Sequence, residues 1–321
     1  MGYDHYSIIP PNPIIFRIGI FAVRWYAVLI FIGIILAIIA SIREGEKRGI
    51  SSELLIDLIF VGVPLSIIGT RLYFILFNNL GWYLRNPIRI IGIYPSGFAG
   101  ISGLAIHGGI IAAGLYTWWY LKKKDIPALP ILDIVAVGFF IGQIVGRFGN
   151  FMNQEAHGPA INAESLDAQR EFLTSLFIPE FIVNGMFING NYYHPTFLYE
   201  ALWNFIGLII AVFVLRRLSK VLIGEIAAFY AIWYSFGRFF IESLRTDSLM
   251  LGSFQIAQVI SVVAIVLVVI LVIYRRKNEK LLIPYSVFNL QEFNRDRKRS
   301  KRKPQKSSNH KNTKNKRQGR K

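Results

Sequence analysis

The chain has 321 residues, of which 53% are hydrophobic and only 17% charged, and its mean hydropathy is +0.43. Soluble domains carry about a quarter of their residues as charged ones, so the composition excludes an ordinary soluble protein and indicates a helical membrane protein. The absence of cysteine excludes disulfides, thiolate metal sites and a cysteine nucleophile. The five histidines lack the spacing of metal motifs, so we expect neither a metal site nor a cofactor.

Seven apolar stretches are long enough to be membrane-spanning helices. In chain order they are residues 18–42, 53–77, 101–121, 131–148, 197–215, 222–241 and 251–274. We therefore predict an all-α integral membrane protein with seven transmembrane helices, formed by residues 1–290. The longest connection is a loop over about residues 149–195.

Positive charge marks one side of the predicted bundle. Lys and Arg gather after the first, third, fifth and seventh spans, at positions 43, 47, 48, 122–124, 216, 217, 220 and 275–277. The positive-inside rule then places the N-terminus outside and the C-terminus in the cytoplasm. With a rise of 1.5 Å per residue, Arg147 and Arg238 lie roughly 24 Å from the cytoplasmic end of their spans. We therefore expect one polar site that faces the outer leaflet.

The C-terminal segment has a different composition. From Arg295 to Lys321 there are 14 Lys or Arg residues and a single acidic residue, Asp296. Because the segment lacks hydrophobic periodicity, we predict that residues 291–321 form a disordered cytoplasmic tail. Anionic membrane lipid is its expected partner, at about 1 kcal/mol per basic residue near the surface. Nucleic acid is a weaker candidate, since no aromatic residue for base stacking follows Arg295.

The segment Gly146–Gly158 places polar groups directly after an apolar run. Arg147, Asn150, Asn153 and Glu155 lie within a dozen residues, separated by glycines. Ionisable groups at membrane depth cost roughly 2.5–3.5 kcal/mol and usually carry function. The alternative is an arginine that snorkels to the headgroups. The glycine spacing and the nearby carboxylate favour a guanidinium that binds phosphate oxygens.

A second polar group lies in the sixth span. Arg238, Glu242 and Arg245 are spaced i, i+4 and i+7, so they share one helix face. A salt-bridged helix terminus would also explain them. Together with Arg147, and with Arg71 in the outer part of the second span, they predict a net-positive cavity suited to an anionic lipid.

Three further residues have both a functional and a structural interpretation. His107 lies among glycines and is either a base at neutral pH or a hydrogen-bonded core group. Tyr26 is either part of the site or an interfacial aromatic residue. Gly100–Gly103 contains Ser102 in a Gly-x-Ser-Gly pattern found in intramembrane serine proteases, but a base and an oxyanion hole are not evident.

Taken together and in this order, the motifs resemble those of the bacterial prolipoprotein diacylglyceryl transferases. Gly146–Gly158 fits the family signature Gly-Arg-x-Gly-Asn-Phe-x-Asn-x-Glu-x-x-Gly at every fixed position. The resemblance extends from about Asn12 to Tyr274, and the basic tail is not part of the family pattern. The other matching motifs are Arg24-Trp25-Tyr26, Gly69-Thr-Arg71, Ala105-Ile-His-Gly-Gly109, His194-Pro-x-x-Leu-Tyr-Glu200 and Gly237-Arg-Phe-Phe-Ile-Glu242.

The resemblance implies an enzyme of the bacterial cell membrane that acts at the outer leaflet. Such an enzyme moves diacylglyceryl from phosphatidylglycerol to the lipobox cysteine of a prolipoprotein signal peptide, forms a thioether and releases glycerol 1-phosphate. The nucleophile belongs to the substrate, so an enzyme without cysteine loses nothing. The implied roles are phosphate binding by Arg147 and Arg238, proton removal by His107, lining by Tyr26, a headgroup pocket at Asn150 and Gly158, and orientation of the arginines by Glu155 and Glu242.

Two other classes of protein are compatible with intramembrane charge. A transporter or lipid flippase would use the same cavity for passage, but it should show inverted repeats and broken helices at the midplane. A purely structural membrane protein is disfavoured by the cost of so many charges within the membrane.

Overall fold

The computed structural model describes residues 11–19, 21–78, 80–91, 93–94, 97–98, 105–245, 250–252, 254–278 and 282–302. Its long helices fall where the apolar stretches predicted them. They are α1 (Trp25–Lys47), α2 (Ser52–Asn78), α4 (Ile106–Lys123), α5 (Ala128–Asn153), α8 (Thr196–Ile209), α9 (Glu225–Ser243) and α10 (Ile256–Asn278). Helix α8 continues through the short turns η3 (Ile210–Val214) and η4 (Leu215–Arg217).

Five of these helical segments are long and apolar enough to cross a membrane. They are Trp25–Lys47, Ser52–Asn78, Ala128–Asn153, Thr196–Arg217 and Ile256–Asn278. Helices α4 and α9 are shorter and more polar, since α4 carries His107 and two lysines, and α9 carries Arg238 and Glu242. The described part of the chain is thus a mostly helical membrane protein.

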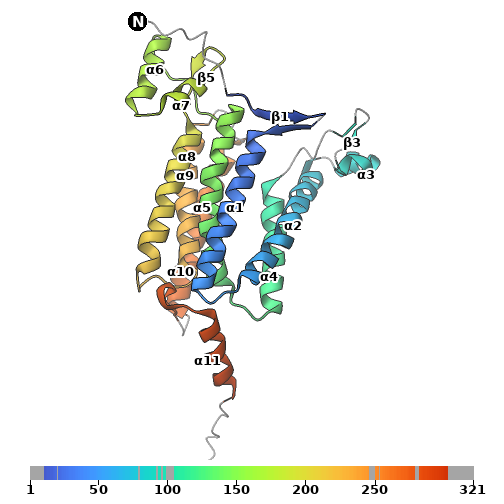
Figure 1. The fold of residues 1–321 in the computed structure, drawn as a ribbon, viewed down its shortest axis with the longest axis vertical. Helices are drawn as coiled ribbons and strands as arrows, with labels where there is room; N and C mark the ends of the chain where they lie inside the picture. Colours follow the sequence, from blue (N-terminus) through green and yellow to red (C-terminus); the bar gives the residue numbers. More distant parts are fainter. Residues whose placement is uncertain are drawn as a thin grey trace, which may run out of the picture.

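Two groups of helices are visible in Figure 1. Helix α1 packs along α5, α5 packs on α8 and α9, and α9 packs on α10, which makes one bundle. Helices α2 and α4 form a separate pair that joins the bundle mainly through α1. The two helices pack closely at Gly69 and Gly108. A methyl group added at Gly108 would overlap the carbonyl oxygen of Gly69. The glycine beside His107 therefore allows close helix packing.

Short elements replace the ends of several predicted spans. Residues 14–24 form a hairpin of β1 (Ile14–Ile18) and β2 (Phe21–Arg24), so the first helix begins at Trp25 and not at residue 18. The last helix starts late because β7 (Met250–Leu251) pairs with β8 (Phe254–Gln255). The remaining small elements on the α2–α4 side are α3 (Leu80–Arg85), η2 (Pro87–Ile91), β3 (Ile93–Tyr94) and β4 (Gly97–Phe98).

The start of α9 is fixed by a side chain from another helix. Asp133 of α5 is fully buried and accepts hydrogen bonds from the backbone N–H groups of Gly224 at 2.5 Å and Ala227 at 2.9 Å. A carboxylate at a helix N-terminus satisfies otherwise unpaired donors and interacts favourably with the helix dipole. Helix α9 therefore starts at Glu225, and the apolar residues before it belong to a turn.

The segment between α5 and α8 is a small folded unit. It contains α6 (Leu166–Ser175), α7 (Glu180–Gly185) and a hairpin of β5 (Phe187–Ile188) and β6 (Asn191–Tyr192). The Ser165 hydroxyl caps α6 by accepting a hydrogen bond from the Ala168 N–H at 3.2 Å. The unit has its own hydrophobic cluster, which includes Leu173, Val183 and Tyr192. The predicted loop over 149–195 is thus an ordered subdomain that follows a longer α5.

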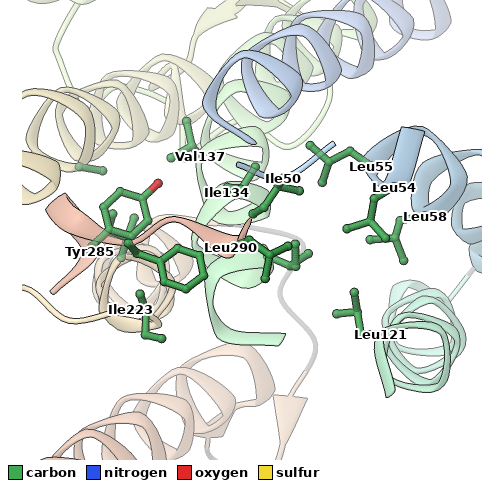
Figure 2. Packing of buried hydrophobic residues seen from close by; sticks show 14 of the residues in the cluster. Ile50, Leu54, Leu55, Leu58, Leu121, Ile134, Val137, Ile223, Tyr285 and Leu290 are labelled. Atoms are coloured by element: carbon green, nitrogen blue, oxygen red, sulfur yellow. The ribbon is translucent and has the colours of Figure 1, made fainter. Parts of the chain in front are cut away.

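The opposite end of the bundle is closed by residues after α10. Tyr285 in η5 (Tyr285–Val287), together with Phe288 and Leu290, is buried in the main core. Figure 2 shows Tyr285 and Leu290 within the same cluster as Ile50 and Ile134.

A helix then follows where the sequence predicted disorder. Helix α11 (Leu290–Arg302) forms because Phe293 packs on Phe288 and Arg297 pairs with Asp125 at 2.9 Å. The prediction of disorder from residue 291 is therefore wrong as far as residue 302, and residues 303–321 lie outside the described part.

A buried ionic cluster holds this end together. Glu44 accepts a hydrogen bond from the Tyr285 hydroxyl at 2.7 Å and pairs with Arg216 at 3.0 Å and Arg48 at 3.4 Å. These residues come from the end of α1, from η4 and from the segment after α10. The basic segments after α1 and α8 therefore meet at one end of the bundle. Arg276, in the last turn of α10, donates to the Lys220 carbonyl at 3.1 Å, and the Arg297–Asp125 pair adds the segment between α4 and α5.

Candidate functional site

Two arginines from different helices are joined by one glutamate. Glu200, in the second turn of α8, is 4% exposed. One of its carboxylate oxygens pairs with Arg147 of α5, and the other lies 3.4 Å from Nη1 of Arg238 of α9. Arg238 also places Nη2 2.5 Å from Glu242, one turn further along α9. The structure thus brings Arg147, Arg238 and Glu242 together, and it adds Glu200 as the residue that connects them.

The charge of this network differs from the predicted one. Its two guanidinium groups and two carboxylates cancel, whereas the sequence suggested a net-positive cavity. The reason is Glu200, because a guanidinium held away from water needs a counter-charge. The arginine side chains keep 18% and 19% exposure, while both carboxylates are nearly inaccessible. The arginine side chains are therefore more accessible than the carboxylates that hold them.

The end of α5 adds an amide and a carboxylate. The Asn150 side chain accepts a hydrogen bond from Arg147 at 3.5 Å and donates one to Glu155 at 3.1 Å. Asn153 donates to the same Glu155 oxygen at 3.2 Å. Gln154 ends the helix in the left-handed conformation, with φ +50°, which turns the chain back toward Asn150. Glu155 therefore reaches Arg147 through the side chain of Asn150.

Glycines at two positions let other segments approach this site. A methyl group at Gly149 would lie 2.7 Å from Cδ2 of Tyr26, so the Tyr26 ring of α1 lies directly against α5 beside Asn150. Gly158 donates its N–H to the carbonyl of His194 at 2.9 Å and has no room for a side chain. Gly158 thus fixes the chain against the start of α8, which is a structural contribution to the site.

His194 lies beside the site, just before the start of α8. Burial lowers the pKa of His194 below its ordinary value. Its Nδ1 lies 3.3 Å from the hydroxyl of Tyr199, one residue before Glu200. Its contacts with Gly158 and Tyr199 make it a link between the subdomain and α8.

Other predicted residues are placed elsewhere. His107 is exposed on α4, and its ring contacts Tyr73 of α2 at 5.9 Å between centroids. Arg71 is 5% exposed and donates to the carbonyls of Arg89 and Ile90 at 2.8 and 2.9 Å, which holds the segment after α3. Arg245 follows α9, and its backbone N–H donates to the Glu242 carbonyl. Ser102 lies outside the described residues.

Two features of the site were missed by sequence reasoning. The first is the role of Glu200, which stands in a family motif but was not predicted to join two arginines. The second feature is a pair of tryptophans between α8 and α9, Trp203 and Trp233, whose rings stack 4.2 Å apart. Each indole N–H donates to the other's backbone carbonyl at 2.9 Å. Within the described residues, no three His, Asp or Glu side chains gather as a metal-binding group.

The fold and the site together define a class of protein. It is a helical membrane protein in which arginines and glutamates from several helices pair at one end of the bundle. Residues 13–274 match the family model described as prolipoprotein diacylglyceryl transferase. The chain therefore belongs to the prolipoprotein diacylglyceryl transferase family, and the resemblance inferred from the motifs is confirmed.

Curated relatives agree with this membership. The phosphatidylglycerol–prolipoprotein diacylglyceryl transferase of Bacillus licheniformis is 45% identical over 271 residues, which cover 84% of this chain and 94% of that protein. The proteins of the same name from Bacillus mycoides and Bacillus cereus (strain G9842) are 45% and 44% identical over 263 residues, which cover 81% of this chain and 91% of each.

Proposed function

We propose that this chain transfers the diacylglyceryl group of phosphatidylglycerol to the lipobox cysteine of prolipoproteins, the first step of bacterial lipoprotein maturation. Family membership and the names of the relatives support the reaction. The observation that carries the site is the Arg147–Glu200–Arg238 network, which holds two guanidinium groups side by side at one end of the bundle.

The reaction makes one bond and breaks one bond. The cysteine sulfur attacks C3 of the glyceryl unit, and the C3–O bond to phosphate breaks. The electron pair leaves with the oxygen, so glycerol 1-phosphate departs and a thioether remains on the peptide. The thiol, whose ordinary pKa is about 8.5, must give its proton to a base. The enzyme has to bind the phosphate, stabilise it as it leaves, and accept that proton.

Arg147 and Arg238 bind the phosphate in this proposal. A guanidinium has five N–H donors and matches phosphate oxygens in bidentate geometry. The carboxylates of Glu200 and Glu242 hold both side chains in place before the lipid arrives, so little reorganisation is needed when charge develops on the leaving group. Asn150 and Glu155 orient Arg147 from the end of α5, Tyr26 lines the pocket, and Arg245 supplies positive charge at its margin. Arg71 instead holds the segment after α3.

His107 is the proposed base, and its position requires a movement. It is exposed on α4, in the pair of helices that joins the bundle mainly through α1. The α2–α4 pair therefore closes toward α5 when both substrates are bound. Near-normal turnover of a His107→Gln variant would remove this assignment and leave the phosphate site untouched.

We also propose that seven helices cross the membrane, with the N-terminus outside. Helices α4 and α9, with 18 and 19 residues, are each about 28 Å long, close to the thickness of the hydrocarbon core. The Glu44 cluster, the Arg276–Lys220 contact and the Arg297–Asp125 pair bring the four basic segments to one end, which supports a cytoplasmic assignment. The arginine network then faces the outer leaflet of the bacterial cell membrane.

The basic C-terminal segment has its own proposed partner, anionic lipid of the cytoplasmic leaflet. Its support is local charge, because α11 begins at the same end of the bundle as the other basic segments and carries Arg295, Arg297, Lys298 and Arg299. Removing residues 303–321 should weaken binding to vesicles that contain phosphatidylglycerol, by an amount that falls as salt rises.

A reconstituted assay tests the proposed reaction. Purified protein is mixed with phosphatidylglycerol and a synthetic lipobox peptide, and peptide mass and glycerol phosphate are followed together. We expect a diacylglyceryl mass gain that disappears when the peptide cysteine is replaced by serine. Phosphate release without a change of the peptide would contradict transfer and indicate a lipase.

A further inference from the structure

The turn between α6 and α7 exposes an unusual amount of apolar surface. Phe172, Leu176, Phe177 and Phe181 are 40%, 46%, 96% and 64% exposed. We call these four residues the α6–α7 tip. Apolar side chains that gather on a surface outside the spanning helices usually mark a contact with a partner or a membrane. The neighbouring Leu173 is fully buried, so the subdomain has a core and the tip is not part of it.

The tip lies beside the end of α5 and the start of α8. The Phe181 ring meets Phe151, in the last turn of α5, edge-on at 6.4 Å. Phe151 in turn stacks on Phe197, the second residue of α8, at 4.8 Å. On the other side of the tip, Phe172 contacts His194, two residues before α8, at 5.5 Å. Aromatic contacts therefore tie the tip to the ends of two spanning helices.

Apolar surface continues from this level along α8. Leu202, Phe205 and Ile206 are about half exposed on that helix, which is one of the five apolar enough to span. Figure 1 shows α6 and α7 at the end of the bundle from which α8 starts. Lipid is the solvent for the exposed face of a spanning helix, so the tip lies where that surface meets the headgroups.

Phe177 has a left-handed backbone conformation that is unfavourable for a large side chain. Its φ is +57°, a conformation that glycine and asparagine adopt readily and that is an outlier for a bulky residue. The turn is closed by the Phe177 N–H, which donates to the Thr174 carbonyl at 3.0 Å. Glycine would satisfy this geometry without strain. A phenylalanine that is almost fully exposed in this position indicates that the ring itself is needed.

We propose that the α6–α7 tip inserts into the bilayer interface beside α8, with phospholipid as its partner. Aromatic residues are enriched at membrane interfaces, and phenylalanine and leucine form the buried face of interfacial anchors. The insertion holds the subdomain, and with it the Gly158–His194 contact, against the membrane above the arginine network. The inference depends on the proposed orientation only for which leaflet is entered, and not on the proposed reaction.

The absence of cysteine makes a direct test possible. Phe177→Cys and, separately, Leu176→Cys are labelled with an environment-sensitive fluorophore in the full chain. The Leu176 variant keeps the Phe177 ring and the Phe177 variant loses it, so a comparison of the two shows whether the ring is required for insertion. The control is Glu164→Cys, an exposed position before α6 at the other end of that helix. Each variant is placed in nanodiscs of phosphatidylcholine and phosphatidylglycerol.

Quenching distinguishes lipid from water at each position. At the tip we expect blue-shifted emission, several-fold stronger quenching by nitroxide-bearing lipid than at position 164, and weaker quenching by aqueous iodide. Equal behaviour at the tip and at position 164 would overturn the proposal. Shielding that appears only when a lipobox peptide is added would also overturn it, and would assign the tip to the peptide.

Discussion

At the scale of single residues, Glu200 decides how the site is built. It is buried and touches guanidinium groups from two other helices, so it fixes the distance between Arg147 and Arg238. Removing one partner of a buried ion pair typically costs about 3–5 kcal/mol, because the other charge stays behind. The proposed binding of phosphate by both arginines depends on this spacing.

The first prediction concerns that carboxylate. Glu200→Gln keeps the shape and removes the charge, so the two guanidinium groups repel each other and lose their fixed geometry. We expect transfer to fall by about 10²–10³, the usual effect of losing a preorganised electrostatic contact. The matched control is Glu292→Gln, whose partner Arg295 is 3.9 Å away at an exposed position of α11. Equal rates for the two variants would show that the charge of Glu200 is not needed for transfer.

Sequence reasoning at this scale found charges but not their partners. Arg147, Arg238 and Glu242 stood out because charge inside a span is costly, and the structure brings them together. Arg71 stood out for the same reason, yet its described contacts hold carbonyls of the following segment. The sequence cannot separate these cases, because the partner of a buried arginine is chosen by tertiary packing.

At the scale of elements, the α8–α9 contact carries the geometry of the site. Trp203 lies one turn after Glu200. Its indole N–H donates to the Trp233 carbonyl, and the Trp233 indole N–H donates to the Trp203 carbonyl. Gly237, next to Arg238, leaves room for the Trp203 ring, since a methyl group there would overlap Cδ1. The relative position of Glu200 and Arg238 is therefore set by tryptophan packing on the same two helices.

The second prediction tests this packing. Gly237→Ala should displace Trp203 and destabilise the protein by about 1–3 kcal/mol, as overpacking usually does. Transfer should fall together with the thermal midpoint, because Glu200 moves away from Arg238. Gly114→Ala on α4 is the control, since a methyl group there meets open space. An unchanged thermal midpoint for Gly237→Ala would refute the proposed packing.

The third prediction concerns the opposite end of the bundle. Tyr285→Phe removes the hydroxyl that donates to Glu44 inside a buried cluster. We expect a loss of about 1–3 kcal/mol, because a buried charged acceptor loses a partner. Tyr274→Phe, at a position that is 65% exposed, should leave the unfolding midpoint in detergent where it is. Identical midpoints for both variants would mean that this cluster does not hold the C-terminal segment.

Elements were predictable where apolar length alone decides them. The seven long helices fall on the seven apolar stretches, whereas the β1–β2 hairpin and α11 were missed. Helix α11 carries only two large apolar residues, Leu290 and Phe293, and its order depends on docking of the preceding Tyr285 and Phe288 into the core. A local sequence pattern does not show that these residues pack against helices from the first half of the chain.

At the scale of the whole molecule, the proposed chemistry depends most on the distance between the α2–α4 pair and the rest of the bundle. Apolar runs predict that these helices exist, and Gly69 and Gly108 explain why they pack on each other. Nothing in a single sequence sets the distance between this pair and the bundle. The proposed role of His107 nevertheless depends on that distance.

The fourth prediction measures the approach of this pair. Spin labels at Ile110→Cys on α4 and Phe205→Cys on α8, both exposed, report the separation of the two groups. We expect it to shorten when phosphatidylglycerol and an unreactive serine-containing lipobox peptide are both present. A pair inside the bundle, Phe205→Cys with Phe240→Cys on α9, should stay constant. A separation that ignores both substrates would exclude His107 as the base.

The phosphate site is tested most directly by one comparison. The rate of diacylglyceryl transfer to a lipobox peptide is measured for the wild-type protein and for Arg147→Lys. Lysine keeps the positive charge but loses the planar fork that pairs with Glu200 and binds phosphate in bidentate geometry. We predict a loss of about 10²-fold or more with the fold retained. Full activity of Arg147→Lys would contradict a phosphate site built on the Arg147–Glu200–Arg238 network.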